Sequence, residues 1–183
     1  MTSKDFKKLL ARTASNQAVG KSLNTILREE NDVTFLQALV DFGNWPSRPL
    51  GEEVKKVPTE RRLVVLLDAF CAAVDSGGIE QVVVDPDLGG LTQEVVSCLK
   101  RIEATSALDY LERIASLFPQ QRIPEDESAR VEMIEEIKRR EQIPNFRILN
   151  KEFAGAVTDA IAALRSHISQ NQADFESILA KPV

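Results

Sequence analysis

The longest run of apolar positions lies between Leu63 and Val74, where Asp68 is the single charged residue. A helix that is apolar on every side is one that other elements surround. Thr59, which follows a proline, suits the N-cap of this helix, and the sequence Ser76-Gly77-Gly78 suits its end, because glycine adopts the left-handed backbone at little steric cost. The pattern predicts a central, buried helix.

Segments with apolar residues three and four positions apart flank this run, and each predicts a helix with one buried face. They cover residues 5–14, 21–30, 32–42, 92–102, 106–117, 125–141, 150–168 and 173–180. Asp32, Thr92, Ser106 and Asn150 are the expected N-caps. In 125–141 the expected apolar stripe is Val131, Ile134 and Ile137. The fold class is therefore predicted as all-α, one compact domain of about seven to nine helices around the Leu63–Val74 helix.

Two segments do not follow the helical pattern. Residues 43–58 carry three prolines around Trp45 and predict an ordered connecting loop, because proline interrupts both helices and central strands. Residues 79–84 contain three consecutive valines, which alone favour a strand. A single short strand without a partner would leave its backbone groups unpaired, so composition and context disagree here.

Charge and composition exclude several classes of function. The chain has 28 Asp and Glu against 23 Lys and Arg, a net charge of -5. Direct binding to nucleic acid is not expected, because it requires clustered cations. No run approaches the roughly 20 apolar residues of a membrane span, and the charged first ten residues do not match a secretory signal. We expect a cytoplasmic protein without membrane association.

Candidate chemistry is sparse. Cys71 and Cys98 lie among apolar neighbours and are expected to be free, inert thiols; with one histidine the chain offers no metal site and no cofactor site. Asp68 and Asp75 lie two helical turns apart, but no nucleophile or cation accompanies them, so an acid–base pair is disfavoured. His167, near a helix end whose partial negative charge would favour protonation, is expected to be structural. No catalytic residue is predicted, and the protein is expected not to be an enzyme.

Residues 75–81 (Asp75, Ser76, Gly77, Gly78, Ile79, Glu80, Gln81), 99–104, 117–119 and 149–153 together resemble the DNA-mimic-protein family of all-helical bacterial domains. The similarity extends from Leu63 to Phe175 and centres on a double-glycine turn followed by a glutamine. Ser76 stands where the family usually has asparagine, Ile79 where it has phenylalanine, and Val82 and Val83 where it tends to have aromatic residues.

The resemblance implies an all-helical fold, including helix rather than strand at 78–84, and no known enzymatic activity. It divides the single domain, 1–183, into N-terminal helices and a proline-rich loop (1–58), a family-like core (59–175) and a tail (176–183). Asp75, Gly77, Gly78 and Gln81 then form a structural turn motif. One family member is similar to duplex DNA in its acidic surface and binds a transcription regulator, so a protein partner is expected.

A DNA mimic requires carboxylates spaced like phosphates on a face with few cations. The candidate partner-binding residues are Glu125, Asp126, Glu127, Glu132, Glu135, Glu136, Asp85 and Asp87. Pairs four residues apart, Glu135 with Arg139 and Glu136 with Arg140, would cancel part of that charge, and a solvated helix face explains the same pattern. Two other functions stay open: a small-molecule or enzymatic site at the double-glycine turn, lined by Gln81, Asp75 and Trp45, and an immunity-type partner of a toxin.

Overall fold

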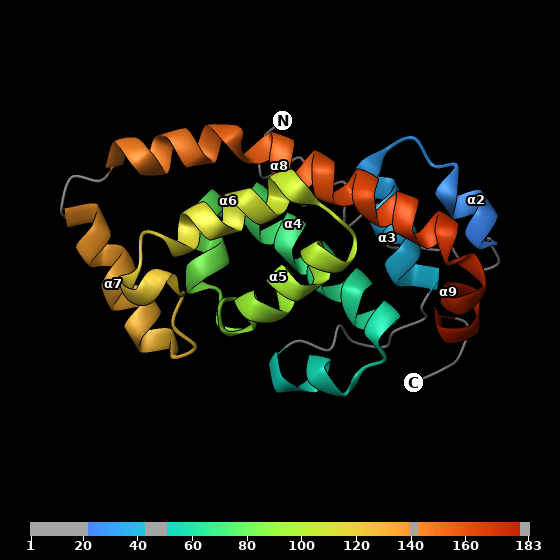
Figure 1. Cartoon of the computed structure of the whole chain (residues 1–183), viewed down its shortest axis with the longest axis horizontal. Coiled ribbons are helices and arrows are strands. Elements are labelled where there is room, and N and C mark those ends of the chain that lie inside the picture. Colours follow the sequence, from blue (N-terminus) through green and yellow to red (C-terminus); the bar gives the residue numbers. More distant parts are fainter. Residues whose placement is uncertain (1–21, 43–50, 140–142, 180–183) are drawn as a thin grey trace.

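The computed structural model of the chain describes residues 22–42, 51–139 and 143–179 (Figure 1). The expected helix at 5–14 and Trp45 lie outside these ranges. The helices are α2 (Leu23–Leu27), α3 (Asp32–Phe42), α4 (Thr59–Val84), α5 (Thr92–Arg101), α6 (Thr105–Ala115), α7 (Glu127–Arg139), α8 (Ile143–Gln170) and α9 (Gln172–Leu179). Short 3-10 helices are η1 (Gly51–Lys56), η2 (Gly89–Leu91) and η3 (Pro119–Gln121). The described residues contain no strand, and the all-α prediction is confirmed.

Helix α4 is the central helix, as the apolar run predicts. Its residues Leu63 to Leu67 are buried, as are Phe70 and Val74 further along. It packs against α3, α5, α7, α8 and α9. Because these neighbours approach from different directions, a helix without a polar face is stable only in this position.

A break at Gly78 divides α4. Gly78 has φ 64° and ψ -142°, a backbone conformation that L side chains rarely adopt. The helix resumes at Ile79, and Ile79, Val82 and Val83 are buried. The helical interpretation of 79–84 is confirmed. Burial against neighbouring helices outweighs the intrinsic strand preference of the valines.

The predicted caps are displaced at several helix starts. Asn31, rather than Asp32, accepts a hydrogen bond from the Thr34 amide at 3.0 Å. Thr59 is the first residue of α4, behind Pro58, which makes no side-chain cap bond. Thr92 opens α5, and its hydroxyl donates back to the Gly89 carbonyl at 2.6 Å. Helix boundaries therefore shift by a residue relative to the cap signals.

Helix α8 begins earlier than expected. It starts at Ile143, so the prediction that Asn150 caps the last long helix is wrong. Pro144 lies in the first turn, where proline removes only an amide that has no partner within the helix. The cap of α6 is also not local: Asp159 of α8 accepts from the amides of Ser106 at 2.9 Å and Ala107 at 3.3 Å.

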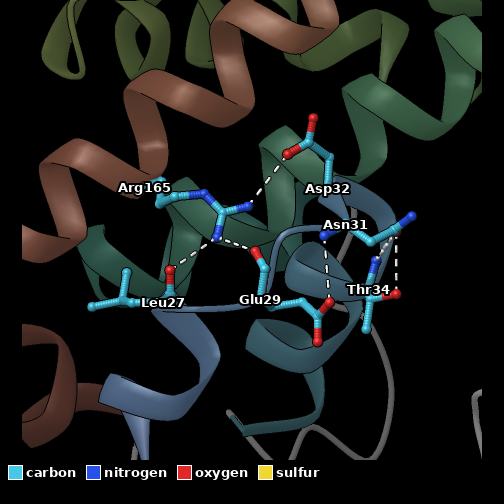
Figure 2. Close-up of polar contacts among 6 residues, drawn as sticks. All are labelled: Leu27, Glu29, Asn31, Asp32, Thr34 and Arg165. Carbon is cyan, nitrogen blue, oxygen red and sulfur yellow. Dashed lines mark hydrogen bonds and ion pairs between the residues drawn. The ribbon is translucent and has the colours of Figure 1, made fainter.

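Arg165 of α8 attaches the first described helices to the rest of the molecule (Figure 2). Its Nη1 donates to the carbonyls of Leu27 at 3.1 Å and Glu29 at 2.6 Å, and its Nη2 pairs with Asp32 at 3.3 Å. The guanidinium also lies 3.8 Å from the centre of the Phe35 ring. One arginine thus fixes both the loop between α2 and α3 and the start of α3.

The described helices form an elongated arrangement (Figure 1). α7 lies at one end of the long axis, and α2 and α9 lie at the other, with α8 running along one side between them. No helix in the described ranges combines the length and the apolar character that crossing a bilayer requires. The candidate partner-binding residues belong to the end that holds α7.

Candidate partner-binding surface

The inward face of α7 differs by one position from the expected stripe. Ile134 and Ile137 are buried, but Val131 is 43% exposed, so its predicted place in the apolar stripe is wrong. Arg130 occupies the inward position instead and is only 1% exposed. Counting back from Ile137 through Ile134 at steps of three and four residues leads to Arg130, and that spacing was the signal in the sequence that could have found it.

The buried guanidinium of Arg130 joins two segments that are distant in the sequence. Its Nε donates to the Val83 carbonyl at 2.7 Å, and its Nη2 donates to the Asp85 carbonyl at 3.3 Å. Its Nη1 donates to the carbonyls of Pro124 and Glu125, just before α7. The last carbonyls of a helix lack intrahelical partners and carry partial negative charge, so the end of α4 suits a cation.

Gly89 makes room for this arginine. A Cβ atom at position 89 would lie 2.3 Å from the Val83 carbonyl oxygen and 2.5 Å from Nε of Arg130. A Cβ at Gly90 would instead lie 3.5 Å from the Glu125 carbonyl oxygen, an ordinary contact. The second double glycine of the chain therefore lies against the start of α7, and only its first member has to lack a side chain.

Lys138 ties the other end of α7 to α4. Its Nζ lies 2.7 Å from a carboxylate oxygen of Glu80 and 3.0 Å from one of Glu135. Hydrogen bonding to Glu80, and then to Glu135, raises the pKa of Lys138. Lys138 meets Glu80 and Arg130 meets Val83, so α7 runs antiparallel to the last turns of α4. The carboxylates of both segments therefore belong to one region.

We call this region the acidic end and define it by the exposed carboxylates of the two segments. They are Glu80, Asp87, Glu125, Asp126, Glu127, Glu132 and Glu135. Arg122 pairs with Glu125, and Lys138 pairs with Glu80 and Glu135, so part of the charge is compensated. Within the described part of the chain, the carboxylates of Asp87, Glu127 and Glu132 have neither an ion pair nor a hydrogen bond.

Two of the candidate carboxylates have structural roles. Asp85 is half-buried, and its Oδ1 accepts from the amides of Asp87 at 3.0 Å and Leu88 at 2.8 Å. This side chain forms the turn that leaves α4. Asp126 accepts from the Ala129 amide at 2.8 Å and caps α7. Glu136 is half-buried, and its expected partner Arg140 lies outside the described residues.

The structural turn motif holds the helix break. A Cβ at Gly77 would lie 2.9 Å from Cβ of Gln81, so the glycine allows Gln81 to pack closely. Gln81 donates from Nε2 to Asp85 at 3.4 Å, rather than to backbone groups of the preceding helix end. Asp75 is exposed and Asp68 is buried, so the two carboxylates considered as an acid–base pair lie in different environments.

Two hollows in the described structure lie away from this motif. One, of about 420 Å³, lies between α6 and α8 and is lined in part by Tyr110, Arg113 and Glu152. The other, of about 330 Å³, lies between α4 and α5 beside Arg62, Cys98 and Arg101. None of the lining residues belongs to the double-glycine turn, so neither hollow supports a ligand site there.

The remaining titratable candidates are buried or half-buried groups. Burial raises the pKa of the Cys71 thiol, and burial also raises the pKa of Cys98 to about 11. His167 is half-buried with its ring edge toward Phe175, the ring centres being 5.9 Å apart. Desolvation, and then the charge of Arg101, lower the pKa of His167, in the direction opposite to the expected effect of the helix end.

Comparison with known families gives a match over more than half of the chain. The family described as DMP19-like protein matches residues 55–171, which include all of α4 to α8 and therefore the whole acidic end. Neither the curated proteins nor the solved structures give a match.

Proposed function

The chain belongs to the DMP19-like protein family, and on this premise we propose that it acts without catalysis, by binding a protein through the acidic end. The proposed partner is a protein with a basic, DNA-binding surface. The observation that carries the proposal is the set of hydrogen bonds from Arg130, because these bonds place the Asp85–Asp87 turn beside Glu125–Glu127.

The charges of this region support a cationic partner. Asp87, Glu127 and Glu132 have no counter-ion within the described residues, and they extend over both segments. Uncompensated carboxylates attract a basic surface over several ångströms and speed association, and salt screens that attraction. A partner surface that normally neutralises phosphates can neutralise carboxylates in the same way.

The experiment compares two triple variants that remove the same charge. The test variant Asp87→Asn/Glu127→Gln/Glu132→Gln removes the unpaired carboxylates of the acidic end. The control Glu103→Gln/Glu112→Gln/Asp174→Asn removes three exposed carboxylates elsewhere, one of them in α9 at the opposite end of the molecule. Wild type and both variants are used to capture proteins from the native host, and the captured protein is purified and titrated.

We expect the test variant to bind the captured protein at least tenfold more weakly, about 1.4 kcal/mol, and the control to bind like wild type. The affinity of the wild type should fall steeply with salt, and duplex DNA should compete with the chain for the partner. Equal binding by both triple variants would exclude the acidic end as the binding surface. Binding that duplex DNA does not displace would exclude a DNA-binding surface on the partner.

A further inference from the structure

Arg130 is a charged side chain in a place where an apolar one would be less costly. Burying a guanidinium removes its hydration, and replacing a buried ionic group with a well-packed apolar residue is often neutral or stabilising. Arg130 is 1% exposed, and the acceptors that surround it are main-chain carbonyls rather than carboxylates. Its presence therefore calls for an explanation other than stability.

The geometry of the hydrogen bonds from Arg130 supplies such an explanation. Arginine carries five N–H donors in a rigid plane, so it fixes the relative position of several acceptors at once, whereas lysine acts as a single point of charge. Here the plane connects Val83 and Asp85 at the end of α4 with Pro124 and Glu125 before α7. Each pair of carbonyls lies at or beside a segment that carries exposed carboxylates, the Asp85–Asp87 turn in one case and Glu125–Glu127 in the other.

The other ion pair between the two helices is weaker. The Lys138–Glu80 ion pair lies at the surface, with half of the Glu80 side chain exposed, and such pairs contribute little to stability. Gly89 is an independent sign that the arrangement is specific, because any side chain there would displace the arginine from Val83. Among the described elements, the principal packing neighbours of α7 are α4 and η2.

We infer that Arg130 is the positioning residue of the acidic end: it sets the spacing between the carboxylates of the Asp85–Asp87 turn and those of Glu125–Glu127 that the partner recognises. This inference rests on the proposed function. It adds that the partner recognises the spacing of the carboxylates and not only their number. Arg130 is buried, so it can affect the partner only through the carboxylates that it positions.

The test uses full-length variants that keep every carboxylate. Arg130→Lys keeps the charge but loses the planar donors, and Gly89→Ala obstructs the same contact from the other side. Gly90→Ala is the matched control, since a side chain at the adjacent glycine makes only ordinary contact. Circular dichroism and amide exchange in α6 and α8 establish that each variant is folded at the temperature of measurement.

Amide exchange over residues 85–91 and 124–131 measures how stably the two segments are held in place, without any partner. We expect faster exchange there in Arg130→Lys and Gly89→Ala, and unchanged exchange in Gly90→Ala. Unchanged exchange in both test variants would overturn the inference, because Arg130 would then not hold the segments together.

Binding is measured with two probes, the protein captured by the wild-type chain and poly-L-lysine, which responds to charge alone. Folded Arg130→Lys and Gly89→Ala should bind the captured protein at least tenfold more weakly but poly-L-lysine as wild type does. A purely stabilising arginine would leave both affinities unchanged in the folded variants, and that result would overturn the inference. If the carboxylate triple variant also bound like wild type, the proposed function would fail as well.

Discussion

His167 is the one side chain of this protein whose ordinary pKa lies near neutrality, and its surroundings decide its charge. Burial and the nearby Arg101 favour the neutral imidazole, while Glu60 acts in the opposite direction. Nε2 is buried and has no hydrogen-bond partner among the described residues, which agrees with a neutral ring. The residue therefore behaves as an aromatic packing group against Phe175.

We predict that this histidine makes the fold less stable in acid. Its pKa is lowered in the folded state, so the unfolded chain binds more protons below the ordinary value of 6.5. Its neutral form stabilises the fold fully above that value, and the contribution is lost as the pH falls through the folded pKa. In thermal unfolding, the melting temperature should change less between pH 7.5 and pH 5.0 in His167→Gln than in wild type.

The same claim can be checked directly, because the chain has a single histidine. Proton NMR should give one imidazole titration curve with a midpoint below 6.5. A midpoint at or above that value would show that burial does not govern this ring.

At the scale of the element, the break in α4 depends on Gly78. An alanine at φ 64° and ψ -142° occupies a region that is essentially restricted to glycine, at a cost of about 1–3 kcal/mol. Gly78→Ala should lower the free energy of unfolding by that amount in chemical denaturation. Gly155→Ala, on an exposed position of α8 with open space around it, should raise it by about 0.5–1 kcal/mol. Similar effects of the two substitutions would contradict this account of the break.

The start of α6 depends on a side chain from another helix. Asp159→Ala removes the acceptor of the Ser106 and Ala107 amides and should cost about 0.5–2 kcal/mol, as the loss of an N-cap does. Asp159→Asn keeps an oxygen acceptor without the charge and should cost less. Urea denaturation of wild type, Asp159→Ala and Asp159→Asn gives the order of their free energies of unfolding. An asparagine variant as unstable as the alanine variant would assign the effect to charge alone.

These helices show which features of the fold can be predicted from the sequence and which cannot. Periodicity predicts most of the described helices from α2 to α9, but not the 79–84 part of α4 or the first turns of α8, because burial of one face is a local pattern with a fixed period. It misses the Asp159 cap because that bond joins residues far apart in the chain. At the site, the acidic residues were visible, whereas the importance of Arg130 was not: an arginine in a charged segment is normally solvated, and only the fold shows that it is buried.

At the scale of the whole molecule, Arg165 adds polar ties to the packing at the end opposite α7 (Figure 1). The family match begins at residue 55, so α2 and α3 lie outside it and are joined to α8 by this arginine (Figure 2). Arg165→Met should lose the guanidinium contact with the Phe35 ring and three hydrogen bonds from a charged donor, each of a kind that contributes about 1.5–3 kcal/mol where it is buried. Because this guanidinium is half-buried, we expect the loss of all three bonds together to lower the free energy of unfolding by an amount in the lower part of that range.

Amide exchange gives the spatial extent of this effect. In Arg165→Met the amides of residues 22–42 should exchange faster, while those of α5 and α6 should keep their wild-type protection. Uniform loss of protection would mean that α2 and α3 cannot separate from the rest of the domain without global unfolding.

The two thiols have a practical consequence for the molecule as a whole. Cys71 and Cys98 are the only cysteines of the chain, and both are buried with raised pKa values. A cysteine introduced at Val131, whose side chain already faces water on α7, would therefore react with a maleimide dye far faster than either native thiol. The wild-type background thus accepts a fluorophore at the acidic end without prior removal of its own cysteines.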